Sequence, residues 1–153
     1  MRAGQFERAV GLLEDLYPGN PRSIVFFDKL KAAYVGLKRY EDAIRVVDEW
    51  IMLGPTPHLY AEKGSLQYQK GDDSSARDTW KRAIEISRGD HRAYRAVYFM
   101  MSSNRLFDDA IAVLEDGRRR LGDENLFRLD LANMYRILGR YDLAMSEYVG
   151  VVS

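Results

Sequence analysis

Gly139-Arg140-Tyr141-Asp142-Leu143-Ala144 decides the fold, because versions of this stretch recur along the whole chain. Its pattern is a glycine, any residue, an aromatic residue, two polar or bulky residues and an alanine. The closing alanines of the five versions are 34, 33, 34 and 34 residues apart: Ala9, Ala43, Ala76, Ala110 and Ala144. A fixed period of about 20 to 50 residues is typical of a solenoid built from repeated supersecondary units.

Each period contains two stretches whose apolar residues recur at helical spacing. Phe27, Leu30 and Tyr34 are three and four residues apart and share one face of a helix expected over residues 23–36. A second helix is expected over residues 40–53, before a segment rich in glycine and proline. Each helix of about 13 residues is too short to be stable alone in water, so the pair must pack together and against its neighbours.

The repeat phase predicts one all-α repeat domain of about nine helices. It divides into a leading half unit, three complete units and an incomplete last unit that starts near Glu124. The expected boundaries are 1–23, 24–56, 57–90, 91–124 and 125–153. The single spacing of 33 residues predicts a one-residue deletion in the connection 55–58, because a deletion inside a helix would rotate its apolar face by about 100°.

Composition excludes several classes of function. Lys plus Arg and Asp plus Glu both number 23, so no overall basic field exists to hold nucleic acid or an anionic membrane. The absence of cysteine excludes disulfides and thiolate metal sites. No run approaches the roughly 18 apolar residues that indicate a transmembrane helix. We therefore expect a soluble chain with no membrane insertion, and either the cytoplasm or the periplasm is compatible with it.

No pattern in the sequence predicts a catalytic, metal or cofactor site. His58 and His91 fall at the starts of helices, where solvated side chains are common. Asp72-Asp73 and Asp108-Asp109 share one repeat phase, which favours helix caps over paired catalytic carboxylates. Arg118-Arg119-Arg120 ends a helix, where cations complement the negative end of the helix dipole.

With each closing alanine counted as repeat position 20, the units resemble the tetratricopeptide repeat (TPR) family over essentially the whole chain. The family pattern asks for a large aromatic at position 4, a small residue at 8, Tyr at 11, Ala at 20 and an aromatic at 24. The principal matches are Phe27, Tyr34 and Ala43; Tyr60, Gly64, Ala76 and Trp80; Tyr94 and Ala110; Ala132, Tyr135, Ala144 and Tyr148. Lys31 at position 8 and Arg128 at position 4 depart from the pattern.

This resemblance implies a right-handed superhelix in which the first helix of each unit lines a concave groove that binds a peptide segment or another protein. The aligned groove residues with suitable chemistry are Tyr68, Arg92, Arg95, Phe99, Asn133 and Arg136. Guanidinium groups bind carboxylates, and an asparagine can hydrogen-bond an extended backbone, so the expected ligand is an acidic-aliphatic peptide. The alternative is that each arginine is solvated or paired with a local acid. Asp28 and Ala32 do not match the two-carboxylate clamp of chaperone-tail-binding members.

The function expected from the sequence is a non-catalytic interaction module that serves as a scaffold or adaptor. Two alternatives stay open. The chain could be the regulatory TPR region of a larger enzyme, or a structural scaffold that forms a homo-oligomer through its uncapped terminal helices. The apolar end of the last unit, Tyr148 to Val152, is the feature that suggests self-assembly.

Overall fold

The computed structural model describes residues 3–19 and 22–153, and the regular structure within them is entirely helical. The described elements are α1 (Ala3–Leu16), the short 3-10 helix η1 (Tyr17–Gly19), α2 (Ile24–Gly36), α3 (Tyr40–Leu53), α4 (Pro57–Lys70), α5 (Asp73–Ile86), α6 (His91–Ser103), α7 (Phe107–Leu121), α8 (Arg128–Ile137) and α9 (Tyr141–Val152). The predicted all-α solenoid of about nine helices is confirmed.

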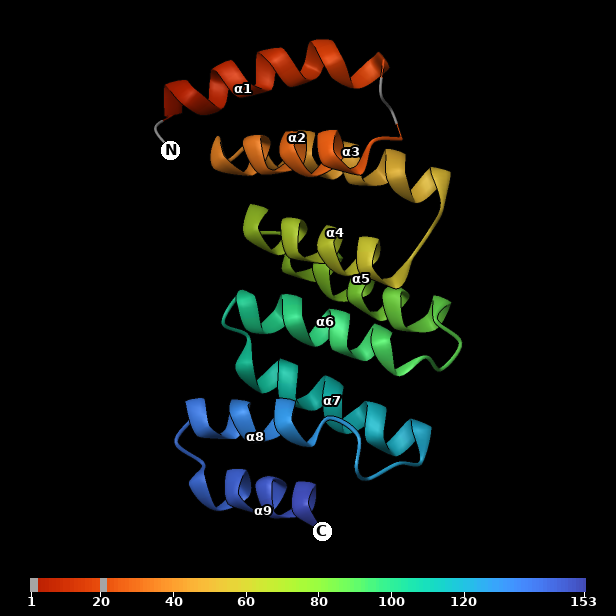
Figure 1. The fold of residues 1–153 in the computed structure, drawn as a ribbon, viewed down its shortest axis with the longest axis vertical. Coiled ribbons are helices and arrows are strands. Elements are labelled where there is room, and N and C mark those ends of the chain that lie inside the picture. Colours follow the sequence, from red (N-terminus) through yellow and green to blue (C-terminus); the bar gives the residue numbers. More distant parts are fainter. Residues whose placement is uncertain (1–2, 20–21) are drawn as a thin grey trace.

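The helices follow one another along the long axis of the molecule, with α1 at one end and α9 at the other (Figure 1). We call α2, α4, α6 and α8 the first helices, and α1, α3, α5, α7 and α9 the second helices. Apolar side chains between successive helices form two buried clusters, one over α1 to α4 and one over α4 to α9. Burial is therefore spread along the stack, as expected when each unit packs mainly on its neighbours.

The left-handed turn before α3, α5, α7 and α9 explains the glycine of the recurring hexad. Gly71 and Gly139 have φ of 100° and 72°, and Lys38 and Arg105 occupy the same repeat position with φ of 57° and 64°. Glycine adopts this conformation without strain, whereas a residue with a Cβ is strained by roughly 1 kcal/mol. Gly71 and Gly139 therefore make tight turns, whereas Gly4, the hexad glycine of the first unit, lies inside α1.

The closing alanines and one internal glycine let the paired helices approach closely. Ala43, Ala76 and Ala110 have no exposed surface. A Cβ added at Gly64 would lie 2.4 Å from Nε1 of Trp80, so only glycine fits against this indole. The expected role of Gly64 in close helix packing is confirmed.

Carboxylates cap two helices as expected. The Asp72 side chain accepts a hydrogen bond from the Ser75 backbone N–H at 3.1 Å, and the Asp90 side chain accepts one from the Arg92 N–H at 2.8 Å. Both caps satisfy backbone donors that the first helical turn leaves without partners. The pKa of the Asp72 carboxyl is lowered because its charged form accepts hydrogen bonds from the Ser75 side chain and from the Ser75 backbone N–H.

The predicted one-residue deletion lies where it was expected. Between α3 and α4 the connection is Gly54–Thr56, and between α5 and α6 it is Ser87–Asp90, which is one residue longer. Thr56 caps α4 by accepting from the Leu59 N–H at 3.2 Å, and Pro57 occupies the first turn, where its missing N–H costs nothing. The shorter connection therefore leaves the apolar face of α4 in register.

The prediction that Asp108-Asp109 caps a helix is wrong. The capping residue of α7 is Leu106, which provides no side-chain hydrogen bond. The two carboxylates instead bind arginines of neighbouring units: Arg140 Nη2 lies 2.8 Å from Asp108 Oδ1, and Arg77 Nη1 lies 2.9 Å from Asp109 Oδ1. Together with Lys70–Glu41 at 2.7 Å, these exposed ion pairs link successive units near the starts of the second helices. We call them the edge ion pairs.

The first helix of the last unit is short and begins only at Arg128. Phe127, the residue before it, adopts a left-handed conformation with φ of 61°, which a continuous helix does not allow. The ring of Phe127 is buried, 6.4 Å from the ring of Tyr94, and a Cβ added at Gly117 would lie 3.0 Å from it. Burial of this ring against α6 and α7 offsets the strained backbone.

Arg128 stands at the position where the family pattern has an aromatic residue. Instead of packing as a ring would, its side chain belongs to an ion-pair cluster with Arg118 and Glu147. Arg118 donates to both carboxylate oxygens of Glu147 at 2.7 Å, and Arg128 Nη1 donates to the same carboxylate at 3.2 Å. Arg118 Nε also donates to the Leu126 carbonyl at 2.6 Å. Arg118 therefore joins α7 to α9, a role beyond the helix-end charge that the sequence suggested.

Candidate functional site

Three of the cavities formed by the described residues lie next to one another along the first helices. The N-terminal cavity, about 650 Å³, lies among α2, α3 and α4; the middle cavity, about 510 Å³, lies among α4, α6 and α8; the C-terminal cavity, about 640 Å³, lies among α6, α8 and α9. His58 lines both the N-terminal and the middle cavity. Arg95 and Asp130 line both the middle and the C-terminal cavity. The shared residues show that the three cavities are neighbours from α2 to α9, and we call them together the track.

The middle cavity brings together four of the six residues predicted from the sequence. Arg92, Arg95 and Phe99 come from α6 and Asn133 from α8. The Phe99 side chain is unusually open for an aromatic residue, with the residue 64% exposed. The arrangement offers donors and an aromatic face to anything that enters the cavity.

Both arginines of the middle cavity have acidic partners within the chain. Arg95 Nε lies 3.1 Å from Asp130 Oδ2 on α8, and Arg92 Nε and Nη2 each lie 2.9 Å from Asp90 Oδ2. The bonds to Arg92 lower the pKa of the Asp90 carboxyl and raise that of the Arg92 guanidinium. Pairing with local acids was the alternative to ligand binding, and the structure shows these pairs. Because exposed pairs contribute only about 0 to 1 kcal/mol, a ligand carboxylate can compete for either guanidinium.

The other two predicted residues lie outside the lining of the middle cavity. Tyr68 is partly buried, with its ring centroid 6.2 Å from that of Trp80, so it contributes to the packing of α4 on α5. Arg136 is exposed on α8, where its Nη2 donates to Asn133 Oδ1 at 2.8 Å. This bond orients the Asn133 amide, which keeps its own N–H donors for other partners.

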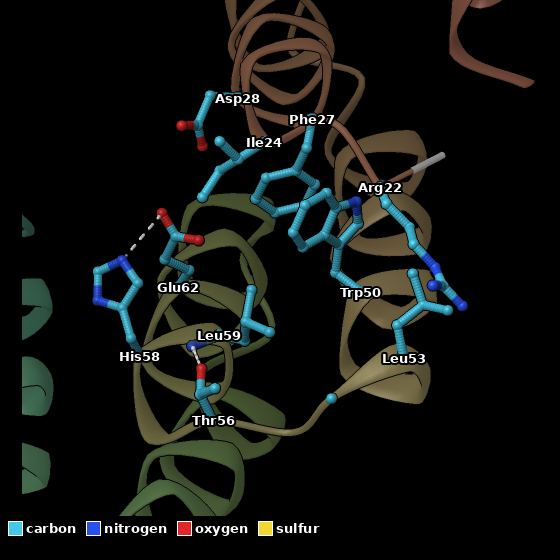
Figure 2. A pocket seen from close by; sticks show the side chains of 11 residues that line it. Arg22, Ile24, Phe27, Asp28, Trp50, Leu53, Thr56, His58, Leu59 and Glu62 are labelled. Carbon is cyan, nitrogen blue, oxygen red and sulfur yellow. Dashed lines mark hydrogen bonds and ion pairs between the residues drawn. The ribbon is translucent and has the colours of Figure 1, made fainter. Parts of the chain in front are cut away.

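The N-terminal cavity was not predicted, and its walls are mostly apolar (Figure 2). The rings of Phe27 and Trp50 meet with centroids 4.5 Å apart, and the carboxylates of Asp28 and Glu62 stand on one side of the opening. One signal in the sequence could have revealed it. Trp50 is seven residues after a closing alanine, where the next two units have Ala83 and Gly117.

Two further features bear on the chemistry of the chain. Within the described residues, no group of three or more His, Asp or Glu side chains is arranged to hold a metal ion. None of the helices in the described ranges has the length and apolar character required to cross a lipid bilayer.

The sequence model of the tetratricopeptide repeat family matches residues 102–149, which include α7, α8 and most of α9. The rest of the chain repeats the period of about 34 residues and the stack of helix pairs seen in the matched segment. Residues 102–149 thus match the tetratricopeptide repeat family, and the whole chain resembles it in period and in fold. The matched segment includes the ion-pair cluster of Glu147 and the late start of α8, so neither departure obscures the TPR pattern.

A TPR repeat-containing protein is similar to this chain in sequence, and solved structures are similar to it in fold. A TPR repeat-containing protein of Methanocaldococcus jannaschii is 26% identical over 110 residues, which are 67% of this chain and 18% of that protein. The chain thus spans only a small part of that relative's length. The crystal structure of MamA has 20% identity and a TM-score of 0.52, covering 97% of this chain and 88% of that one. A TPR protein of Parabacteroides merdae has 15% identity and a TM-score of 0.57, covering 97% and 59%. At these identities the two structures show a shared TPR fold.

Proposed function

We propose that the chain is a non-catalytic scaffold or adaptor that holds a segment of a partner protein in the track along its first helices. TPR repeats are generally interaction modules. The observation that carries the proposal is the adjacency of the three cavities, which places side chains of successive units along one path. A path of this kind fits an extended segment better than a compact small molecule.

The middle cavity favours a segment with acidic and aliphatic side chains. Arg92 and Arg95 present guanidinium groups that bind carboxylates with two hydrogen bonds. Phe99 supplies exposed apolar area next to them. Asn133 stands on the facing helix, where its amide can bond the backbone of an extended ligand.

Reversing the charge of both arginines is expected to weaken partner binding about tenfold or more, because like charges would face the ligand's carboxylates. The double variant Arg92→Glu, Arg95→Glu would be compared with the wild type in affinity capture from a cell extract, followed by titration of each captured protein at moderate salt. The control is Arg119→Glu, Arg120→Glu, which changes the net charge equally on exposed residues at the end of α7.

The wild type and the control should retain a partner that the groove variant loses. Circular dichroism should show equal helix content in all three proteins, since the exchanged side chains are exposed. Equal affinity of the groove variant and the control for every captured partner would contradict the proposed binding site.

A second candidate function is self-assembly through α9, and an exposed apolar stripe favours it. Tyr141, Met145, Tyr148 and Val152 are four, three and four residues apart and are exposed by 65, 59, 37 and 85%. Ile111 and Leu114, at the repeat positions of Met145 and Tyr148, are buried on α7. We propose that a second copy of the chain covers this stripe.

The variant Met145→Lys is expected to remove any association that the wild type shows, because it places a charge at the centre of the stripe. Sedimentation velocity over a concentration series measures this directly. The matched control is Ser146→Lys on the neighbouring exposed position of the same helix. A wild type that remains monomeric at the highest concentrations would rule out self-assembly.

A further inference from the structure

Trp50 makes the N-terminal cavity different from the corresponding regions of the other units. At its repeat position the next two units have Ala83 and Gly117, both buried between helices. A large side chain at a position that elsewhere holds a small one accounts for the cavity beside it.

The floor of this cavity is apolar and its polar atoms already have partners. Trp50 Nε1 donates to the Tyr17 hydroxyl at 2.9 Å, so the indole has no unsatisfied donor to place in the cavity. Phe27 and Leu59 are buried beneath the opening. Ile24 and Leu53 stand at its mouth and are 60% and 55% exposed (Figure 2). An apolar side chain that entered would cover exposed apolar surface without displacing a hydrogen bond.

The rim adds a charge preference. Lys31 Nζ lies 2.6 Å from Glu62 Oε1 and 3.4 Å from Asp28 Oδ1, so Glu62 holds the ammonium more closely. The Asp28 side chain is 59% exposed, whereas those of Lys31 and Glu62 are each 16% exposed. Asp28 is therefore the accessible acid of the rim and favours a cation at its own side of the cavity, whereas the exposed Arg22 lines the opposite side (Figure 2).

We propose that the N-terminal cavity is an anchor site for a partner segment that inserts a phenylalanine-sized side chain and carries a lysine or arginine beside it, with the cation on Asp28. The volume of about 650 Å³ lies within the roughly 300 to 1,000 Å³ of sites for small ligands. The inference rests on the proposed function, because the cavity is the end of the same track and His58 joins it to the middle cavity. It gives the partner segment a direction, with a basic-aromatic part at α2 to α4 and an acidic part at α6 and α8.

The test is a titration followed by ¹H–¹⁵N NMR, with N-acetyl-Phe-Lys-amide as the probe. The side-chain N–H signal of Trp50 and the backbone signals of Leu53 and Leu59 are expected to shift as the probe is added. N-acetyl-Phe-Glu-amide should bind about two- to fivefold more weakly, the range expected for one exposed charge pair. N-acetyl-Ala-Lys-amide should produce no saturable shift, because it lacks the apolar group.

Two variants of exposed residues complete the test. Leu53→Glu places a charge at the mouth and should abolish the shifts, and Asp28→Asn should remove the preference for Lys over Glu. The inference is overturned if the Trp50 signal does not move in the wild type, if Leu53→Glu responds like the wild type, or if Asp28→Asn keeps the preference. The Arg92→Glu, Arg95→Glu variant should bind the probe normally. The probe titration therefore tests the N-terminal cavity alone, and its result does not depend on whether the middle cavity binds a partner.

Discussion

Replacing Trp80 with alanine is expected to lower the free energy of unfolding by about 3 to 5 kcal/mol, the usual cost of truncating a buried aromatic residue. Trp80 is 1% exposed and lies in the centre of the larger apolar cluster. Its Nε1 donates to the Ala61 carbonyl at 3.0 Å, so truncation also removes one buried hydrogen bond. The loss should be large because the indole fills the close approach between α4 and α5 that Gly64 permits.

Urea unfolding followed by far-UV circular dichroism measures this loss. The variant Gly64→Ala provides a sharper check, because its added Cβ would collide with the Trp80 indole. In the wild-type background Gly64→Ala should lower the free energy of unfolding by about 1 to 3 kcal/mol. In the Trp80→Ala background the same change should cost much less, because the indole that the added Cβ would meet is absent. Additive losses in the double variant would show that this packing contact is not the origin of either effect.

Replacing Glu147 with leucine is expected to cost about 2 to 3 kcal/mol, because two partly buried guanidinium groups would lose their shared carboxylate. Removing one member of a fully buried ion pair costs about 3 to 5 kcal/mol. The side chains of Arg118, Glu147 and Arg128 are 17, 13 and 23% exposed, so some solvent screening lowers the cost here. The loss should be confined to the C-terminal units, because a solenoid unit depends mainly on its neighbours.

Hydrogen exchange resolves where the Glu147→Leu variant is weakened. Amides of α8 and α9 should exchange faster than in the wild type, and those of α2 and α3 should be unchanged. The matched control is Glu124→Leu, an exposed acidic residue in the connection before α8. Uniform acceleration along the whole chain, or none at α9, would contradict a local role for the cluster.

The fold could be predicted because every unit that contains two helices repeats the same pattern of apolar residues and the same turn before its second helix. The alanine period placed the second helices, and the helix α3 was predicted with the bounds that the structure gives it. Caps such as Asp72 are local features that depend on residues three positions away, so one sequence suffices to recognise them.

Contacts between units could not be predicted in the same way. Arg77 pairs with Asp109, 32 residues away, and nothing in the sequence near Asp109 indicates which cation it meets. The interruption at Phe127 depends on the space above Gly117, which is a property of packed helices. For the middle cavity, aligning the first helices of the units was enough to bring Arg92, Arg95, Phe99 and Asn133 together. The cavity beside Trp50 could have been predicted only by comparing the size of the side chain at that repeat position across the units.

The edge ion pairs have a mechanical consequence. They join successive units along one border of the stack, and each contributes at most about 1 kcal/mol because its side chains are exposed. The apolar contacts between the same helices are far stronger in sum. A change in the angle between units therefore breaks the weak links first, and added salt lowers that resistance further. The solenoid should therefore bend more easily than it separates, because bending breaks only the exposed ion pairs while the apolar contacts between helices remain.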